Sequence, residues 1–113
     1  MKTIKEIIEH HNKYVRACVL DEVLADYADD AMILTPGGAY HGKEEIAAFF
    51  ADSFKTCLPP ESVWVDDNLL IDGPMAVTMW HAKSPFAEFT FGSDSFTILN
   101  EKITYQSFVG IQK

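Results

Sequence analysis

The pattern of apolar residues changes at the proline pair Pro59-Pro60, and this change limits what the chain can fold into more than any other feature. Before the pair, apolar residues recur at the three- and four-residue spacing of amphipathic helices. After it, segments rich in Phe, Thr and Val are separated by turn sequences with Gly, Pro or Asn, a pattern typical of strands. Helices followed by a run of strands favour an α+β fold, with helices packed on a curved antiparallel sheet.

Three helices are predicted before the prolines. The first has an apolar stripe that also contains a His and a Tyr: Ile4, Ile7, Ile8, His11, Tyr14, Val15 and Cys18. A short second helix is predicted with Asp21 as its cap and Tyr27 on its apolar face, followed by a strand over Ala31–Leu34. After a turn at Pro36-Gly37-Gly38, the third helix is predicted to start after Gly42. Its buried face is expected to comprise Ile46, Phe49, Phe50, Phe54 and Cys57.

Four strands are predicted after the prolines, over Ser62–Ile71, Met75–Lys83, Phe86–Leu99 and Ile103–Ile111. The third of these contains Gly92, where a strand can bend or bulge. A bent sheet covered by helices encloses a cone, and such cones hold pockets for small ligands. We therefore expect a binding pocket between the helices and the sheet.

Charge and cysteine content exclude several classes of protein. The chain has 113 residues with 9 Lys+Arg and 17 Asp+Glu, and its net charge of −8 argues against nucleic acid or an anionic membrane as partner. This length predicts one domain, residues 1–113. No uncharged stretch is long enough to span a bilayer, and early charges oppose a signal peptide, so we expect a cytoplasmic protein. Cys18 and Cys57 match no metal-ligand spacing, which predicts free thiols and no metal.

Four segments of the chain resemble the NTF2-like superfamily, especially its SnoaL-like and ketosteroid-isomerase-like branches. They are Asp26–Gly38, Tyr40–Phe50, Ser93–Ile98 and Lys102–Phe108. The resemblance implies the NTF2-like cone, in which three N-terminal helices pack on a curved antiparallel sheet. It also implies a pocket for a small apolar molecule, and we expect no cofactor. It does not fix the function, because the fold carries isomerases, cyclases, dehydratases, hydrolases and binding modules.

The ketosteroid-isomerase branch works with three groups, and the chain resembles it at two of them. Tyr14 is similar to a helix-one tyrosine and Asp94 to a protonated late-strand acid, which together would donate hydrogen bonds to an enolate oxygen. Thr35 stands where the isomerases carry the aspartate that moves the proton, and a threonine cannot replace that base. His11, one turn from Tyr14, is the candidate replacement, because a free imidazole titrates at about pH 6.5. The alternative for His11 is a core histidine.

Further ligand contacts are expected from inward-facing residues: Tyr27, Thr35, Phe50, Phe54, Thr78, Trp80 and Phe96. The aromatic members of this set could equally be plain core. Two alternatives to an enzyme stay open, namely a binding module without proton transfer and an interaction domain whose cone is filled by side chains. On the outer face of the sheet, Val77 and Met79 suggest burial against a second subunit, so a homodimer is expected.

Overall fold

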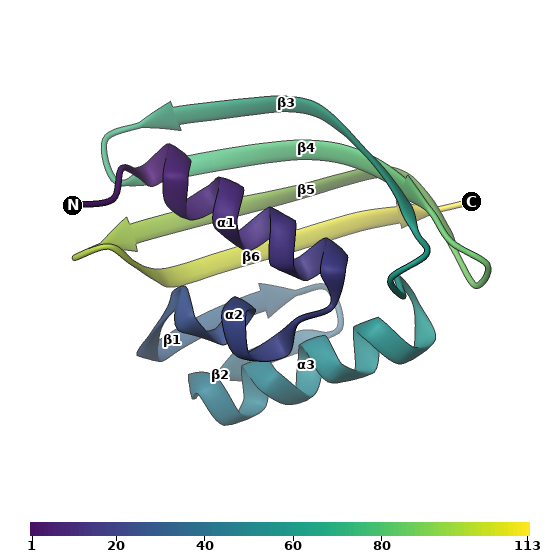
Figure 1. The fold of residues 1–113 in the computed structure, drawn as a ribbon, viewed down its shortest axis with the longest axis horizontal. Helices are drawn as coiled ribbons and strands as arrows, with labels where there is room; N and C mark the ends of the chain where they lie inside the picture. Colours follow the sequence, from purple (N-terminus) through teal and green to yellow (C-terminus); the bar gives the residue numbers. More distant parts are fainter.

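Six strands form one sheet, and three helices lie on one of its faces (Figure 1). This computed structural model describes the whole chain, residues 1–113. Across the sheet the strands follow the order β2-β1-β6-β5-β4-β3. In chain order the elements are α1 (Ile4–Ala17), α2 (Leu20–Ala25), β1 (Tyr27–Thr35), β2 (Gly38–His41), α3 (Gly42–Thr56), β3 (Val63–Asp72), β4 (Met75–Lys83), β5 (Glu88–Leu99) and β6 (Lys102–Gln112).

The α+β class is confirmed, but the sheet is mixed rather than wholly antiparallel. Strands β3 to β6 form the predicted antiparallel meander. Strand β1, however, lies parallel to β6, with Ile33 opposite Gln106. Strands joined by a tight hairpin must run antiparallel, whereas β1 and β6 are separated by most of the chain. The turn sequences therefore carry no information about the direction of this pair.

The segment around Tyr27 also differs from the prediction. Helix α2 ends at Ala25, and Tyr27 begins β1 instead of continuing a helix. Tyr27 pairs with Ile103 of β6, so pairing within the sheet outweighs the helical spacing of the local apolar residues. After the predicted turn the chain returns as β2, a strand that was not predicted. Consequently α3 follows a hairpin, and the three helices do not form one N-terminal run.

Helix α1 is built as the sequence predicts. It starts with a capping box, in which the N–H of Glu6 donates to Oγ1 of Thr3 and the N–H of Thr3 donates to Oε1 of Glu6. Its fully buried residues, Ile7, Ile8 and His11, lie on the predicted stripe. This stripe turns one polar side chain, His11, toward the interior of the molecule.

Two apolar clusters lie between the helices and the sheet. The larger one includes Ile7, Ile8, Tyr27, Ile33, Ile46, Phe50 and Phe96. The smaller one consists of Leu58, Trp80, Ala82 and Phe89. Trp80 crosses Gly92 so closely that a Cβ atom at this position would overlap the indole ring. The glycine inside β5 therefore serves the packing of Trp80 on the sheet.

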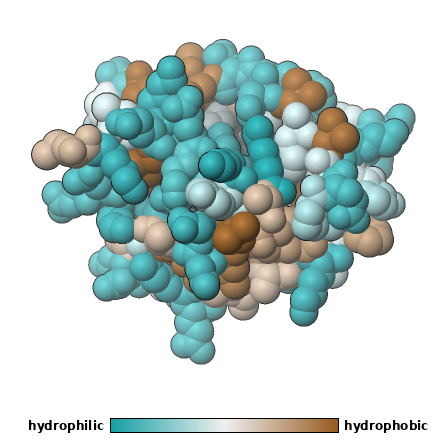
Figure 2. Space-filling model, in the orientation of Figure 1, coloured by the Kyte–Doolittle hydropathy of each residue, from teal (hydrophilic) through white to brown (hydrophobic).

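The helix-covered side of the molecule presents a mostly hydrophilic surface, interrupted by smaller hydrophobic patches (Figure 2). Charged side chains of α1 that lie opposite its buried stripe contribute to this surface, among them Lys5, Glu9 and Lys13. None of the three helices combines the length and the apolar character that crossing a membrane requires.

Candidate functional site

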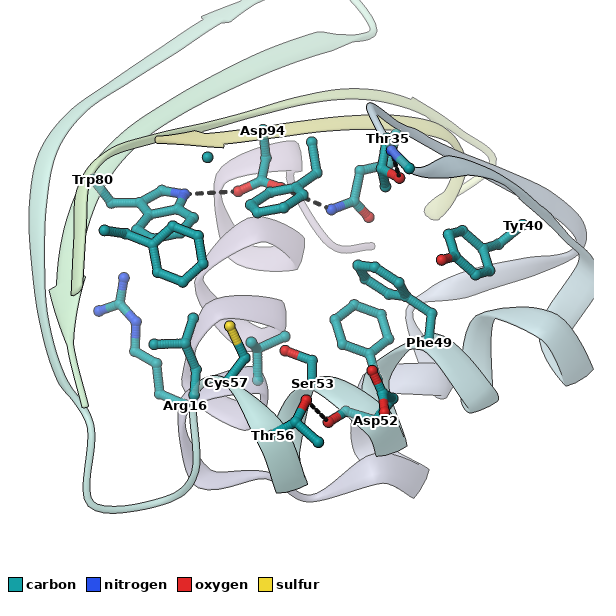
Figure 3. Close-up of a pocket in the computed structure, with 18 of the residues that line it drawn as sticks. Arg16, Thr35, Tyr40, Phe49, Asp52, Ser53, Thr56, Cys57, Trp80 and Asp94 are labelled. Atoms are coloured by element: carbon teal, nitrogen blue, oxygen red, sulfur yellow. Dashed lines mark hydrogen bonds between the residues drawn. The ribbon is translucent and has the colours of Figure 1, made fainter. Parts of the chain in front are cut away.

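A cavity of about 550 Å³ lies between the sheet, α1 and α3 (Figure 3). Aromatic rings form much of its wall: Phe49, Phe50, Trp64, Trp80, Phe89 and Phe108. Asp94 projects from the sheet on one side of the cavity, and Ser53 of α3 and Cys57, the residue that follows α3, lie across from it (Figure 3). A cavity of this volume is large enough for a small organic molecule.

Asp94 is held in place by donors from the neighbouring strands. Nε1 of Trp80 donates to its Oδ2 atom at 2.8 Å, and Nε2 of Gln106 donates to its Oδ1 atom at 3.0 Å. The hydroxyl of Thr78 lies 3.5 Å from Oδ2, at the limit of a hydrogen bond. The register brings these groups together, because Asp94 stands between Thr78 of β4 and Phe108 of β6.

Burial raises the pKa of Asp94 to about 6, because the ionised carboxylate loses hydration. Hydrogen bonds from Trp80, Gln106 and Thr78 act in the opposite direction by favouring the ionised form. At neutral pH the carboxyl is thus ionised, yet its pKa is close enough for it to take up and release a proton. The resemblance implied a protonated acid that donates a hydrogen bond, whereas these partners all donate to Asp94.

Gln106 connects Asp94 to a fully buried tyrosine. The hydroxyl of Tyr27 donates to Oε1 of Gln106, and the amide N–H of Gln106 donates to Asp94. Burial and the nearby Asp94 and Asp26 raise the pKa of Tyr27, so its hydroxyl stays protonated. The sequence analysis missed Gln106. The available signal was a polar residue at an inward position of the last strand, opposite Phe96.

His11 lines the same cavity from α1. Only 3% of the residue is exposed, and its ring meets Tyr27, Phe50 and Phe96 edge to face, with centroids 5.6, 6.0 and 5.4 Å away. Burial, together with the neighbouring His10, lowers the pKa of His11 to about 3. The imidazole is therefore neutral at physiological pH and holds protons too weakly to act as the expected base.

Two other predicted site residues lie outside the cavity wall. Tyr14 is half-buried, and its ring packs against His10 with the centroids 4.6 Å apart. Tyr14 lies one turn from His11 on the same side of α1, but it packs against the core cluster and does not line the cavity. Phe54 packs against Phe50, behind the wall, at a centroid distance of 5.9 Å. The expected pairing of Tyr14 with Asp94 is thus not found in the cavity.

Of the remaining residues predicted to contact the ligand, three line the cavity and three lie behind the lining residues. Phe50, Trp80 and Thr35 line the cavity, but the Thr35 hydroxyl is engaged in its own turn, where it donates to the carbonyl of Gly38 at 3.0 Å. The other three stand behind the wall: Tyr27, Thr78 and Phe96. The predicted alternation along β4 is confirmed, since Thr78 and Trp80 are buried whereas His81 is exposed.

An ion pair that the sequence did not reveal lies at another part of the wall. Both terminal nitrogens of the Arg16 guanidinium donate to the carboxylate of Asp66 on β3, and the guanidinium carbon lies 5.2 Å from the Trp64 ring centroid. Arg16 lowers the pKa of Asp66 through these bonds. The charge of Arg16 is therefore already balanced within the chain. Nowhere do three His, Cys, Asp or Glu side chains gather as metal ligands would.

Comparison with solved structures finds the same fold in bacterial proteins of low sequence identity. An NTF-2 like protein of unknown function from Burkholderia xenovorans LB400 has a TM-score of 0.82 and 17% identity, covering 97% of this chain and 84% of that one. A protein from Kribbella flavida DSM 17836, provisionally named a ketosteroid isomerase, has a TM-score of 0.78 and 14% identity, with 95% and 76% covered. One from Sinorhizobium meliloti, provisionally named a polyketide cyclase, has a TM-score of 0.73 and 18% identity, with 90% and 92% covered.

These likenesses show the fold alone, because the identities are low. No curated protein matches the chain in sequence. A family model does match it: the model of the SnoaL-like domain aligns with residues 8–106, which include most of α1, all elements from α2 to β5 and the first part of β6. The expected NTF2-like resemblance is thereby confirmed, and the chain belongs to the family of SnoaL-like domains.

Proposed function

We propose that the cavity binds a small, largely apolar carbonyl compound and that Asp94 moves a proton at the carbon next to the carbonyl group. The reaction would be an isomerisation, cyclisation or dehydration that passes through an enolate. One observation carries the proposal: a carboxylate with a pKa of about 6 faces an aromatic cavity and has only neutral hydrogen-bond donors around it.

The surroundings of Asp94 suit a reversible proton acceptor. Trp80 and Gln106 donate one hydrogen bond to each carboxylate oxygen, which fixes the plane of the group and leaves further lone pairs free to accept a proton. No cation pairs with the carboxylate, so nothing lowers its pKa to the range of a surface aspartate. A pKa near the working pH gives the best compromise between being ionised and being basic.

The proposed step is balanced as a simple proton transfer. The C–H bond next to the carbonyl breaks, its proton passes to Asp94, and its electron pair moves into the carbonyl to form the enolate. Asp94 then returns the proton to the same carbon or to another position, which completes an exchange or an isomerisation. The aromatic wall around the cavity weakens the hydration of the carboxylate and so strengthens it as a base.

Hydrogen–deuterium exchange tests this proposal without knowledge of the natural substrate. Small cyclic ketones and lactones are incubated with the protein in D₂O, and proton NMR follows the loss of the signal next to the carbonyl. We expect accelerated exchange for at least one compound and a loss of about 100-fold or more in Asp94→Asn, the usual contribution of a general base. Asp67→Asn, which changes an exposed acid on β3, is the matched control. Accelerated exchange that survives in Asp94→Asn would refute the role of Asp94.

Binding without catalysis is the second candidate function, and Thr35 favours it. Its hydroxyl is held in the turn, so the position where the ketosteroid isomerases carry their aspartate offers no general base. A protein of this kind would bind the ketones yet leave their exchange rates unchanged. A purely structural interaction domain is less well supported, because the cone contains a cavity of about 550 Å³ instead of being filled.

We further propose that the chain forms a homodimer through the outer face of the sheet. All three helices lie on the other face, and the outer face carries the half-buried Val77 and Met79 with the exposed Leu34, Met75 and Tyr105. Exposed apolar patches of this kind are typical of protein interfaces. We expect sedimentation to give a dimer for the wild type and a monomer for Met79→Lys. A monomeric wild type at tens of micromolar would contradict the proposal.

A further inference from the structure

We propose that His11 is the second polar group that contacts the ligand, its Nε2 atom forming a hydrogen bond with the ligand's oxygen; this inference rests on the proposed function. The ligand would then lie between the carboxylate of Asp94 and the imidazole of His11. The sequence suggested His11 as a base, whereas we infer from the structure that it forms a hydrogen bond with a neutral oxygen atom of the ligand.

The first argument is that His11 is buried but has no hydrogen-bond partner. Its Nδ1 atom is buried and unpaired, and the nearest carboxylate oxygen, Oδ2 of Asp26, lies 4.0 Å away. Nε2 is not among the buried atoms without a partner, and His11 lines the cavity, so we infer that Nε2 is the ring nitrogen that a molecule in the cavity would reach. Buried polar groups in folded proteins nearly always have partners, so an unpaired one on a cavity wall points to a missing ligand.

The adjacent His10 shows what a satisfied histidine looks like in the same helix. Its Nδ1 atom lies 2.8 Å from Oδ2 of Asp26, and its Nε2 atom lies 3.2 Å from Oε2 of Glu22. Both ring nitrogens of His10 therefore have partners, and the residue joins α1 to α2. His11 has the same chemistry one position along the chain but faces the cavity, and there its nitrogens are left without partners.

The second argument is the position of His11 relative to Asp94. The His11 ring contacts Phe96, which stands two residues after Asp94 on β5 and so shares its inward face. It also contacts Tyr27, whose hydroxyl is joined through Gln106 to Asp94. We therefore infer that the imidazole of His11 and the carboxylate of Asp94 border the same part of the cavity, where one small molecule can contact both.

The chemistry of the pair narrows the ligand class. A neutral imidazole can donate a hydrogen bond to a carbonyl oxygen or accept one from an enol hydroxyl, without competing for the proton that Asp94 moves. A carboxylate ligand would place a second anion beside Asp94, and the one guanidinium on the wall, that of Arg16, is already paired with Asp66. The site thus fits a neutral ketone, lactone or enol and disfavours a carboxylic acid.

The test compares two probes of the same shape, a naphthol and naphthalene, where the naphthol carries an enol-like hydroxyl group. Binding is followed by quenching of tryptophan fluorescence, since Trp64 and Trp80 both line the cavity. We expect His11→Phe to weaken naphthol binding about tenfold, the effect of one lost hydrogen bond, and to leave naphthalene binding nearly unchanged. The same variant should melt at a higher temperature than the wild type, because it removes an unpaired buried nitrogen.

His10→Phe is the matched control and should behave in the opposite way, with a lower melting temperature and unchanged naphthol affinity. Equal binding of naphthol by the wild type and by a folded His11→Phe would overturn the inference while leaving the proposed function intact. A wild type that binds neither probe would overturn both. If His11→Phe fails to fold, His11→Gln, which keeps a hydrogen-bonding group, must bind naphthol more tightly than His11→Leu, or the inference fails.

Discussion

The molecule contains two buried carboxyl groups, and their surroundings differ in one decisive way. Asp26, only 4% exposed, lies at the end of α2 and accepts a hydrogen bond from His10, a residue that can carry a positive charge. Asp94 lies on β5 and is surrounded by neutral donors, with a cavity in front of it. Burial raises the pKa of both carboxyl groups. A raised pKa is therefore not enough to identify the functional acid.

What separates the two groups is the space around them. Around Asp26, the side chain of His10 and the backbone of neighbouring elements fill the site, and the hydrogen bond joins two helices. Around Asp94, the partners leave one side open to a cavity that also exposes an unpaired imidazole. We infer that Asp26 stabilises the fold and that Asp94 takes part in the proposed proton transfer. Four predictions test this contrast.

The largest expected effect is a pH dependence of stability that belongs to Asp94. The folded state holds its proton with a pKa of about 6, against an ordinary value of 3.8. This stabilising contribution is complete below about pH 4 and is lost as the pH rises to about 6. At about 1.4 kcal/mol for each pKa unit, the loss amounts to roughly 3 kcal/mol. Urea unfolding of the wild type and Asp94→Asn at pH 4 and pH 7 measures it as a difference between the two proteins.

Between pH 4 and pH 7 the free energy of unfolding of the wild type should fall relative to that of Asp94→Asn, because the asparagine does not titrate. Asp26 titrates in both proteins, so its contribution cancels in the comparison. If the two proteins differ in their free energy of unfolding by the same amount at pH 4 and at pH 7, Asp94 has an ordinary pKa. The proposed difference between Asp94 and Asp26 would then be wrong.

The second prediction concerns the contribution of the His10–Asp26 hydrogen bond to stability. Replacing His10 by Phe leaves the carboxyl of Asp26 buried without its closest partner, and we expect a loss of about 2 kcal/mol in the free energy of unfolding. Deuterium exchange of ketones should remain within about threefold of the wild-type rate, because neither residue lines the cavity. A strong loss of exchange in a folded His10→Phe protein would place Asp26 in the chemistry after all.

A smaller effect is expected at Gly92, the residue beneath the indole that holds Asp94. In Gly92→Ala the new Cβ atom overlaps the Trp80 ring, which must shift, and we expect a destabilisation of about 1.5 kcal/mol. The shift should also break the hydrogen bond from Nε1 of Trp80 to Asp94 and raise the pKa of this carboxyl. Gly37→Ala, at a turn position without a positive φ where a new Cβ atom would meet only an ordinary contact at 3.7 Å, separates general backbone effects from this specific one. An unchanged Asp94 pKa in Gly92→Ala would argue against the role of Trp80.

Much of this contrast rests on contacts that sequence patterns cannot supply. Helical spacing and turn residues are local signals, so α1, the start of α3 after Gly42 and the strand meander were predictable. The resemblance located Asp94. In contrast, Gln106 reaches Asp94 only through the register of β5 and β6, and the pairing of Arg16 with Asp66 joins residues on α1 and β3. Likewise, His11 lines the cavity whereas Tyr14, one turn along the same face of α1, does not, and helical spacing alone cannot distinguish the two.

The smallest effect tests whether the buried network keeps Asp94 ionised. The Tyr27 hydroxyl donates to Oε1 of Gln106, so the Gln106 amide N–H must point toward Asp94. In Tyr27→Phe this constraint is lost, and the amide can turn its oxygen toward the carboxyl, a contact that favours the protonated acid. We expect the Asp94 pKa, measured by carboxyl-carbon NMR, to rise, with a stability loss of about 1 kcal/mol. Tyr105→Phe, at an exposed position next to Gln106, should change neither quantity. An Asp94 pKa that falls or stays constant in Tyr27→Phe would show that the burial of the carboxyl alone sets its proton affinity.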